Sequence, residues 1–441
     1  MMTLRAKQAS RLGDIEGRFD PVVIGAALAL AAVGVVMVAS SSFGVAERLG
    51  VGPFHFAIRH VVYLLAGMVL AGLLGRVELR RIERQGPRLL LLALALLVLV
   101  LLPHVGAEVN GSQRWLKFGP LRFQVVEAAK LLLIVWLASY LVRHRTQAQN
   151  TWWGLLKPGL IAGAMVMLLL QQPDFGSAIL ICAIVAGMVF LGGVRISNLV
   201  APLLIVPPLM LAVAMYRPYR MRRLTSFLDP WSDPYNDGYQ LVQALIAIGR
   251  GEWLGVGIGA SIQKLSFLPE AHTDFIFSVL AEEAGFIGVM LVIGLFVLLV
   301  GRAFQLGLAA MRLKRAFAGY CAFGVGLWIG LQAAVSIGVN LGLLPTKGLT
   351  LPLISSGGSS VLMTCAAIGL LLRVSYEVDR TERQIARIRE GAVQVEPPRE
   401  GDIPVPGAAG PPHPGAQDRP GVTLPVSGGR GRIEPTLGGT A

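Results

Sequence analysis

The stretch from Lys264 to Gly285 reads K-L-S-F-L-P-E-A-H-T-D-F-I-F-S-V-L-A-E-E-A-G, and it decides the fold. Its first half is polar and ends at Asp274, where a long apolar run begins that extends from Phe275 to Val300. Such a run is long enough to cross the hydrocarbon core of a bilayer. A carboxylate at the mouth of a hydrophobic helix lies at the edge of a low-dielectric region, which raises its proton affinity. Asp274 is therefore our candidate for the catalytic base of a membrane enzyme.

The composition of the whole chain also indicates a membrane protein. Of its 441 residues, 54% are hydrophobic and only 15% are charged, which is unlike a soluble domain. The three cysteines, Cys182, Cys321 and Cys365, lie inside apolar runs, where a free thiol packs as a small apolar group. The net charge of +13 is explained by arginines that collect on the cytoplasmic side of a membrane protein, so we expect no nucleic-acid partner.

Ten apolar runs predict an all-α polytopic membrane protein with about ten transmembrane helices. The predicted spans are residues 21–41, 56–74, 89–102, 123–142, 159–170, 176–193, 198–215, 275–300, 316–339 and 352–373. A large periplasmic loop, residues 216–273, separates helices 7 and 8. The predicted organisation is a cytoplasmic tail (1–20), a transmembrane domain (21–376) and a disordered cytoplasmic tail rich in Pro and Gly (377–441).

Basic residues set the predicted orientation. The links 76–88, 143–157 and 302–315 are rich in Arg and Lys, and they fall on one side if both termini are cytoplasmic. Two links on the opposite side also contain basic residues, which favours an anionic ligand at the outer face. Arg114 and Lys117, in the first of these links, could hold a phosphate, because the arginine fork matches phosphate oxygens and lysine supplies a point charge.

Polar residues near the spans supply the other candidates. Trp115 has the amphipathic ring favoured at a membrane interface, so it is either an ordinary anchor or part of a site. Glu127 and Lys130 are three residues apart and share one helical face. Charges at that depth are usually functional, and the alternative is an internal ion pair that fixes helix packing. The I-S-S-G-G-S-S segment at 354–360 is typical of a helix entry with hydroxyl caps.

Several strings of the sequence together resemble one family, the SEDS proteins (shape, elongation, division and sporulation). They cover the region from about Phe19 to Arg373: N-G-S-Q-R-W, F-Q-V-V-E-A-A-K, Q-Q-P-D-F-G-S-A, P-E-A-H-T-D-F-I-F, A-E-E-A-G and K-G-L-T-L-P-L-I-S-S-G-G-S-S. The last string resembles the division branch more than the elongation branch. Two positions depart from the pattern: Val125-Val126 stand where the family commonly has Pro-Ser, and Ser356 where it has Tyr.

The resemblance implies a ten-span peptidoglycan glycosyltransferase that polymerises lipid II in septal cell-wall synthesis. By motif match, the essential aspartate of the family falls on Asp274 and its essential tryptophan on Trp115. The polar cavity implied by the resemblance includes Arg114, Glu127 and Lys130. With Trp115, with the cations proposed for the pyrophosphate and with the two residues before Asp274, they make up our candidate substrate-binding residues: Arg114, Trp115, Lys117, Glu127, Lys130, Arg217, Arg220, Lys264, His272 and Thr273. We expect no protein metal site, and Mg²⁺ or Mn²⁺ is a candidate cofactor.

The resemblance further implies a multi-pass protein of the bacterial inner membrane at the division site, with its active site on the periplasmic face. The expected partners are lipid II, membrane lipids, a class B penicillin-binding protein (the septal transpeptidase of the FtsI type) and other divisome membrane proteins. In the expected reaction, Asp274 takes a proton from a sugar hydroxyl as undecaprenyl pyrophosphate leaves, and such help gives about 10²–10⁴-fold. The alternatives are a lipid II flippase and a non-catalytic scaffold for the transpeptidase.

Overall fold

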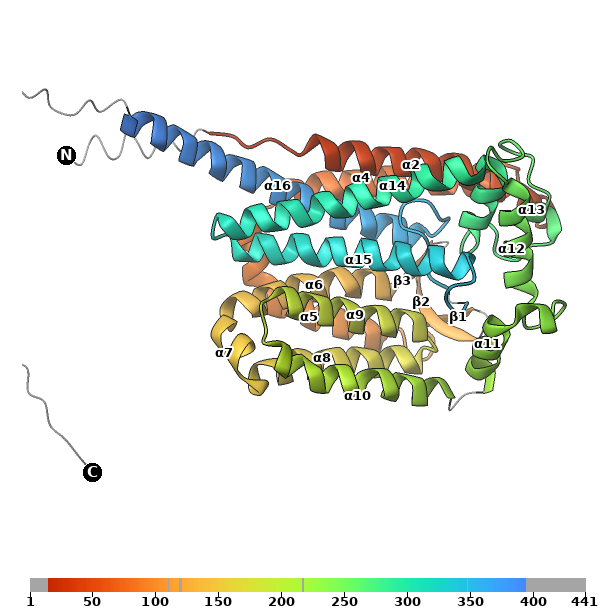
Figure 1. The fold of residues 1–441 in the computed structure, drawn as a ribbon, viewed down its shortest axis with the longest axis horizontal. Coiled ribbons are helices and arrows are strands. Elements are labelled where there is room, and N and C mark those ends of the chain that lie inside the picture. Colours follow the sequence, from red (N-terminus) through yellow and green to blue (C-terminus); the bar gives the residue numbers. More distant parts are fainter. Residues whose placement is uncertain (1–14, 110, 119–120, 216–217, 347, 394–441) are drawn as a thin grey trace, which may run out of the picture. The chain divides into compact units, whose positions relative to one another are not determined.

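The computed structural model describes residues 15–109, 111–118, 121–215, 218–346 and 348–393 (Figure 1). A long helix occurs at each of the ten predicted positions: α2 (Pro21–Ser41), α4 (His55–Arg76), α5 (Leu79–Leu99), α6 (Val125–Arg143), α8 (Trp152–Gln171), α9 (Phe175–Leu191), α10 (Ile196–Met215), α14 (Ile276–Arg312), α15 (Ala316–Asn340) and α16 (Gly358–Val393). Within the described part of the chain, eight of these are long and apolar enough to cross a membrane. The other two are α9, which has 17 residues, and α5, whose first half is charged. The polytopic helical class is confirmed.

Polar bonds between α2 and α14 define the two ends of the bundle. At the start of α2, the Asp20 carboxylate caps the helix by accepting from the backbone N–H groups of Val22 and Val23. The same carboxylate accepts from Arg302 of α14 at 2.8 Å. At the other end of α2, Ser40 donates to Glu283, near the start of α14. The two helices are therefore antiparallel neighbours (Figure 1). We call the Asp20–Arg302 end the basic end and the opposite one the Asp274 end.

Helix α6 is the centre of the bundle, and α10 is at its edge. In the apolar window of α6, 89% of the residues are buried inside the protein, whereas in α10 the share is 12%. The short helices α3 (Phe43–Arg48) and α7 (Arg145–Asn150) join longer ones. Cys321 of α15 and Cys365 of α16 are buried, and Cys182 of α9 is half-buried. A span with so little buried surface as α10 must present most of its apolar side chains to lipid.

A small antiparallel sheet replaces the loop predicted between the third and fourth spans. Its strands are β1 (Gly106–Val109), β2 (Ser112–Phe118) and β3 (Leu121–Gln124), in that order. Gly111, in the β1–β2 turn, has φ of +72°, a left-handed conformation that glycine adopts without a Cβ clash. The sheet lies at the same end of the bundle as α12 and α13 (Figure 1).

The segment predicted as a large loop is mostly helical. It forms α11 (Pro218–Leu228), the short 3₁₀ helix η1 (Pro230–Ser232), α12 (Tyr239–Gly251) and α13 (Gln263–Ser266). Helix α12 packs on α14, and the backbone after it approaches α14 at Gly285, which breaks the helix with φ of +64°. The predicted start of the C-terminal tail, residue 377, falls inside α16, which continues to Val393. The rest of that tail, and residues 1–14, lie outside the described residues.

Candidate functional site

Asp274 lies in a segment whose backbone is fixed at three successive carbonyls. The His272 carbonyl accepts from the Ser356 N–H at 2.9 Å. The Thr273 carbonyl accepts from the Ser355 hydroxyl at 2.7 Å, and the Asp274 carbonyl accepts from the Asn340 side chain at 2.9 Å. We call residues 272–274 the anchored segment. Because donors from the end of α15 and from the loop before α16 hold it, the segment has one defined position at the start of α14.

The carboxyl group of Asp274 lies next to the loop that joins α15 to α16, which we call the 341–357 loop. A Cβ built on Gly348 would lie 3.3 Å from Asp274 Oδ2, closer than most Cβ contacts in proteins. Asp274 itself is half-buried, and Gly348 is exposed. The absence of a side chain at Gly348 thus leaves room beside the carboxylate.

His272 and Thr273 make different contacts on either side of the carbonyl anchors. The Thr273 hydroxyl donates to the carboxylate of Glu270 at 2.8 Å, which closes the preceding turn. The His272 ring packs against Phe56 of α4, and its buried Nδ1 has no hydrogen-bond partner among the described residues. Burial lowers the pKa of the His272 imidazole, while Glu270 opposes this shift and Arg48 adds to it. Because this nitrogen is enclosed beside Phe56, a ligand reaches it only after the ring moves.

The sheet brings Trp115 and two cations to the same end of the molecule. Trp115 pairs with Gln124, whose N–H donates to Ser359 at the start of α16. Lys117 pairs directly with Arg122 across β2 and β3, and both side chains are exposed. Like charges directly opposite each other destabilise a sheet. Within the described part of the chain no carboxylate pairs with either, so this face is suited to an anionic ligand.

Arg114, in contrast, is engaged within the protein. Its guanidinium donates to the carbonyls of Gln172 and Pro173 and lies 3.9 Å from Asp174, all in the turn between α8 and α9. Asp174 in turn caps α9 by accepting from the Ser177 N–H, as expected from its place before the helix. Arg114 therefore joins the sheet to the helix bundle.

Glu127 and Lys130 form a buried ion pair, which confirms that they share a helical face. Lys130 Nζ is 2.9 Å from Glu127 Oε1 and 2.6 Å from the side-chain oxygen of Gln332 on α15. Gln332 also donates to the Thr350 carbonyl, so the network reaches the 341–357 loop. Glu127 Oε2 is buried and has no partner among the described residues. The pair fixes helix packing, and its second carboxylate oxygen is enclosed inside the protein.

Lys264 is also held in a buried ion pair. Its Nζ donates to Glu283 at 2.6 Å and to the Ser40 hydroxyl at 2.8 Å, and 4% of its side chain is exposed. The adjacent carboxylate, Glu282, pairs with Arg250 of α12 at 2.8 Å. These bonds fasten α12 and α13 to α14 and α2, and they engage the Lys264 charge before any ligand arrives.

Two predicted site residues, Arg217 and Arg220, and a possible metal site remain to be placed. Arg217 lies outside the described residues, and the side chain of Arg220 does too. Among the side chains that the structure describes, no group of three or more His, Cys, Asp or Glu could hold a metal ion. The residues that sequence reasoning missed are Asn340, Ser355, Gln332 and Gly348. Only the small, polar I-S-S-G-G-S-S segment signalled one of them, Ser355.

This arrangement defines a class: a polytopic helical membrane protein with an anchored acidic segment, an adjoining cationic sheet face and buried polar networks at one end of the bundle. Residues 21–380 match the model of the FtsW/RodA/SpoVE family, described as cell cycle proteins. The chain belongs to this family.

Similar proteins cover most of the chain. It is 55% identical to a probable peptidoglycan glycosyltransferase FtsW from Xanthomonas oryzae over 90% of this chain and 81% of that protein. It is 47% identical to a protein of the same name from Coxiella burnetii over 83% and 98%. The model superposes on a chain from a peptidoglycan synthase complex with a TM-score of 0.67 at 35% identity, covering 82% of this chain and 98% of that one. The rod shape determining protein RodA of Thermus thermophilus gives 0.60 at 33% identity, covering 81% and 96%.

Proposed function

We propose that this chain is a peptidoglycan glycosyltransferase of the FtsW branch, which polymerises lipid II into glycan strands during septal cell-wall synthesis. The names of its relatives support this activity. The observation that carries the residue assignment is the anchored segment, in which three carbonyls in a row are held from outside the segment. Such a scaffold positions a catalytic group within the small tolerance that catalysis requires.

Asp274 is the general base in this proposal. It removes the proton from the acceptor sugar hydroxyl as that oxygen forms a bond to the anomeric carbon of the donor sugar. The bond between that carbon and the pyrophosphate oxygen breaks, and the undecaprenyl pyrophosphate leaves with its charge.

The pyrophosphate requires positive charge as it departs. Of the candidates, Lys130 and Lys264 are buried in ion pairs, and Arg114 is bound to carbonyls. Lys117 is exposed and faces Arg122 across the sheet, so we assign the leaving group to this pair. Because the chain places these charges on its own residues, assays with and without Mg²⁺ will show whether a cation shares the task.

The orientation in this proposal follows from charge. The basic end, with Arg302 and the links at residues 76–88 and 302–315, faces the cytoplasm. Both termini then lie inside, and the Asp274 end faces the periplasm at the division site of the inner membrane. The similarity to a chain of a peptidoglycan synthase complex supports a partner that crosslinks the product, namely a class B penicillin-binding protein of the FtsI type with its divisome neighbours.

The test uses purified full-length protein and lipid II, with and without the transpeptidase partner. We expect Asp274→Asn to fold and reach the membrane but to lose at least about 10²-fold in glycan synthesis, the lower bound for a general base. Asp237→Asn, the same change at an exposed carboxylate of the large loop, should keep normal activity. Normal polymer from Asp274→Asn would remove Asp274 as the base.

Two further results would replace the proposal. Transfer of labelled lipid II between leaflets without polymer would make the protein a flippase. Division in cells whose only copy carries Asp274→Asn would leave it a scaffold for the transpeptidase.

A further inference from the structure

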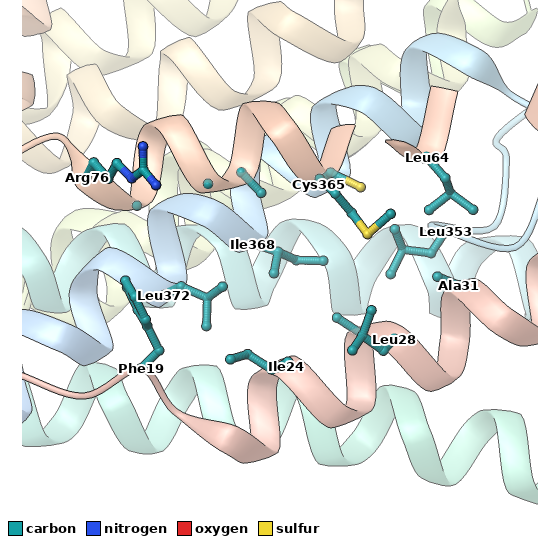
Figure 2. Close-up of a pocket in the computed structure, with 15 residues that line it drawn as sticks. Phe19, Ile24, Leu28, Ala31, Leu64, Arg76, Leu353, Cys365, Ile368 and Leu372 are labelled. Carbon is teal, nitrogen blue, oxygen red and sulfur yellow. The ribbon is translucent and has the colours of Figure 1, made fainter. Parts of the chain in front are cut away.

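An apolar groove lies between α2, α4 and α16, away from the site described above. Its volume is about 400 Å³, within the range of ligand pockets in proteins. Figure 2 shows Phe19, Leu372 and Arg76 at one end of the groove and Leu64 and Leu353 at the other. Except for Arg76, the side chains that line it are apolar.

The groove occupies the half of the bundle at the basic end. Phe19 is next to Asp20, which binds Arg302 at that end. The other end of the groove reaches Leu353, whose carbonyl lies beside Gly34, in the middle of α2. A site on this half faces the leaflet opposite the one at which Asp274 lies. It is therefore separate from the place where the sugars of the substrate react.

Small residues make the groove. Ala27 and Ala31 of α2 and Ala71 and Gly72 of α4 are among the residues that line it. A Cβ built on Gly72 would meet no atom within 4 Å, so open space remains beside this glycine. On a face that lies in the hydrocarbon core, this space is filled by a lipid chain, since neither water nor a polar ligand is stable there.

Arg76 supplies a charge at the mouth. It is the last residue of α4, its side chain is exposed, and no carboxylate of the described residues lies within ion-pair distance of it. An arginine at a helix C-terminus is favourable in itself, and arginines are frequent on the cytoplasmic side. Among the described residues that line this groove, however, Arg76 is the only charged one. Basic pockets between transmembrane helices at this face bind anionic lipid headgroups.

We propose that this groove is a binding site for an anionic glycerophospholipid of the cytoplasmic leaflet, with one acyl chain along α2, α4 and α16 and the phosphate on Arg76. The site goes beyond the proposed glycosyl transfer, and its occupant is not the lipid-linked substrate. The acyl chain would end at Leu353, a non-glycine residue with φ of +64°. Two residues further on, Ser355 holds the anchored segment, so the bound lipid would touch the loop that positions Asp274.

The test measures lipid binding by native mass spectrometry of the full chain in detergent, which needs no enzymatic activity. The probes are phosphatidylglycerol and phosphatidylcholine with the same acyl chains. We expect Arg76→Gln to weaken phosphatidylglycerol binding about fivefold, the effect of one basic residue at a membrane surface, and to leave phosphatidylcholine binding unchanged. Gly72→Leu, which fills the groove, should weaken the binding of both lipids.

Matched controls separate the groove from general effects. Arg88→Gln removes another exposed arginine of the same link, and Gly163→Leu adds the same side chain to open space on α8. Both should bind lipid like the unaltered chain. Unchanged phosphatidylglycerol binding by Arg76→Gln and Gly72→Leu would overturn the proposal. So would displacement of phosphatidylglycerol by undecaprenyl pyrophosphate at equal concentration, which would make the groove a site for the leaving group. A dimer of the chain without bound lipid would also overturn it, because a second copy would then cover the groove.

Discussion

Asp274 owes its position to residues far away in the sequence. The donor to its carbonyl, Asn340, is 66 residues away, and the donor to the Thr273 carbonyl is 82 residues away. Each such bond contributes about 0.5–1.5 kcal/mol net, and leaving a buried partner unsatisfied costs about 1–3 kcal/mol. Three of them on consecutive residues therefore restrict the backbone of the segment strongly. The position of Asp274 is thus set by hydrogen bonds to backbone carbonyls.

The substitution Gly348→Ala tests this geometry directly. The new methyl group would lie 3.3 Å from Asp274 Oδ2, so the carboxylate must shift by a few tenths of an ångström. Since a displacement of about 1 Å can cost 10²-fold, we expect glycan synthesis to fall roughly tenfold with little change in Tm. Gly52→Ala is the control, because a Cβ there meets open space. Full activity in Gly348→Ala would show that the base tolerates displacement.

The sequence allowed part of the site to be predicted. Glu127 and Lys130 could be paired because helical periodicity is local. The identity of the third partner, Gln332, could not, since it is 202 residues away from Lys130. For the same reason Lys264 stood in the sequence as an open phosphate ligand, whereas the structure pairs it with Glu283. Charge alone did not show which cations are already neutralised.

Among the elements, the helices could be predicted and the sheet could not. An apolar run of span length needs no partner to be recognised. The strands at residues 106–124 are short, and their pairing depends on contacts between strands and with Ser359. Helix α16 continues beyond the predicted span end at residue 373 to Val393. This extension is rich in charged residues, so the hydropathy that predicts a span did not predict it.

The start of α6 contains one departure from the family pattern, Val125-Val126. Gln124 is the N-cap, with φ of −83° and ψ of 110°, and Val125 is the first helical residue. Proline is favoured at this position, and the extended conformation of Gln124 suits a residue before proline. We expect Val125→Pro to fold and to raise stability by about 0.4–1 kcal/mol, measured as an increase in Tm.

Val126→Ser, the second change toward the pattern, should lower stability, because Val126 is buried and apolar. A lower Tm for Val125→Pro would mean that the N–H of Val125 is needed in the fold.

The buried ion pair between Lys264 of α13 and Glu283 of α14 gives a prediction about stability. Lys264→Met leaves Glu283 charged and buried, and Glu283→Gln leaves Lys264 in the same state, so each should cost about 3–5 kcal/mol. The double variant Lys264→Met with Glu283→Gln should be less destabilised than the sum of the two. A double-mutant cycle in chemical denaturation measures the difference. Strict additivity would contradict a direct pair, and the exposed Arg81–Glu78 pair serves as a control with little coupling.

At the scale of the whole molecule, the 341–357 loop joins the separate networks. The Glu127–Lys130 network reaches it at Thr350, the anchored segment at Ser355 and Ser356, and the lipid groove at Leu353. A change at any of these three places can therefore alter the position of Asp274. Hydropathy did not predict this connection, because it assigned residues 352–357 to the tenth span, whereas the structure begins α16 at Gly358 and places them in the loop.

The burial of the native thiols has a practical consequence for topology. Cys321 and Cys365 are enclosed in the bundle, and Cys182 lies in an apolar helix, so water-soluble maleimides should leave the unaltered chain unlabelled. A single cysteine at an exposed position then becomes a clean reporter. In intact spheroplasts we expect Lys117→Cys to be modified from outside and Arg312→Cys, at the far end of α14, only after permeabilisation. The reverse labelling pattern would mean that the Asp274 end faces the cytoplasm, opposite to the proposed orientation.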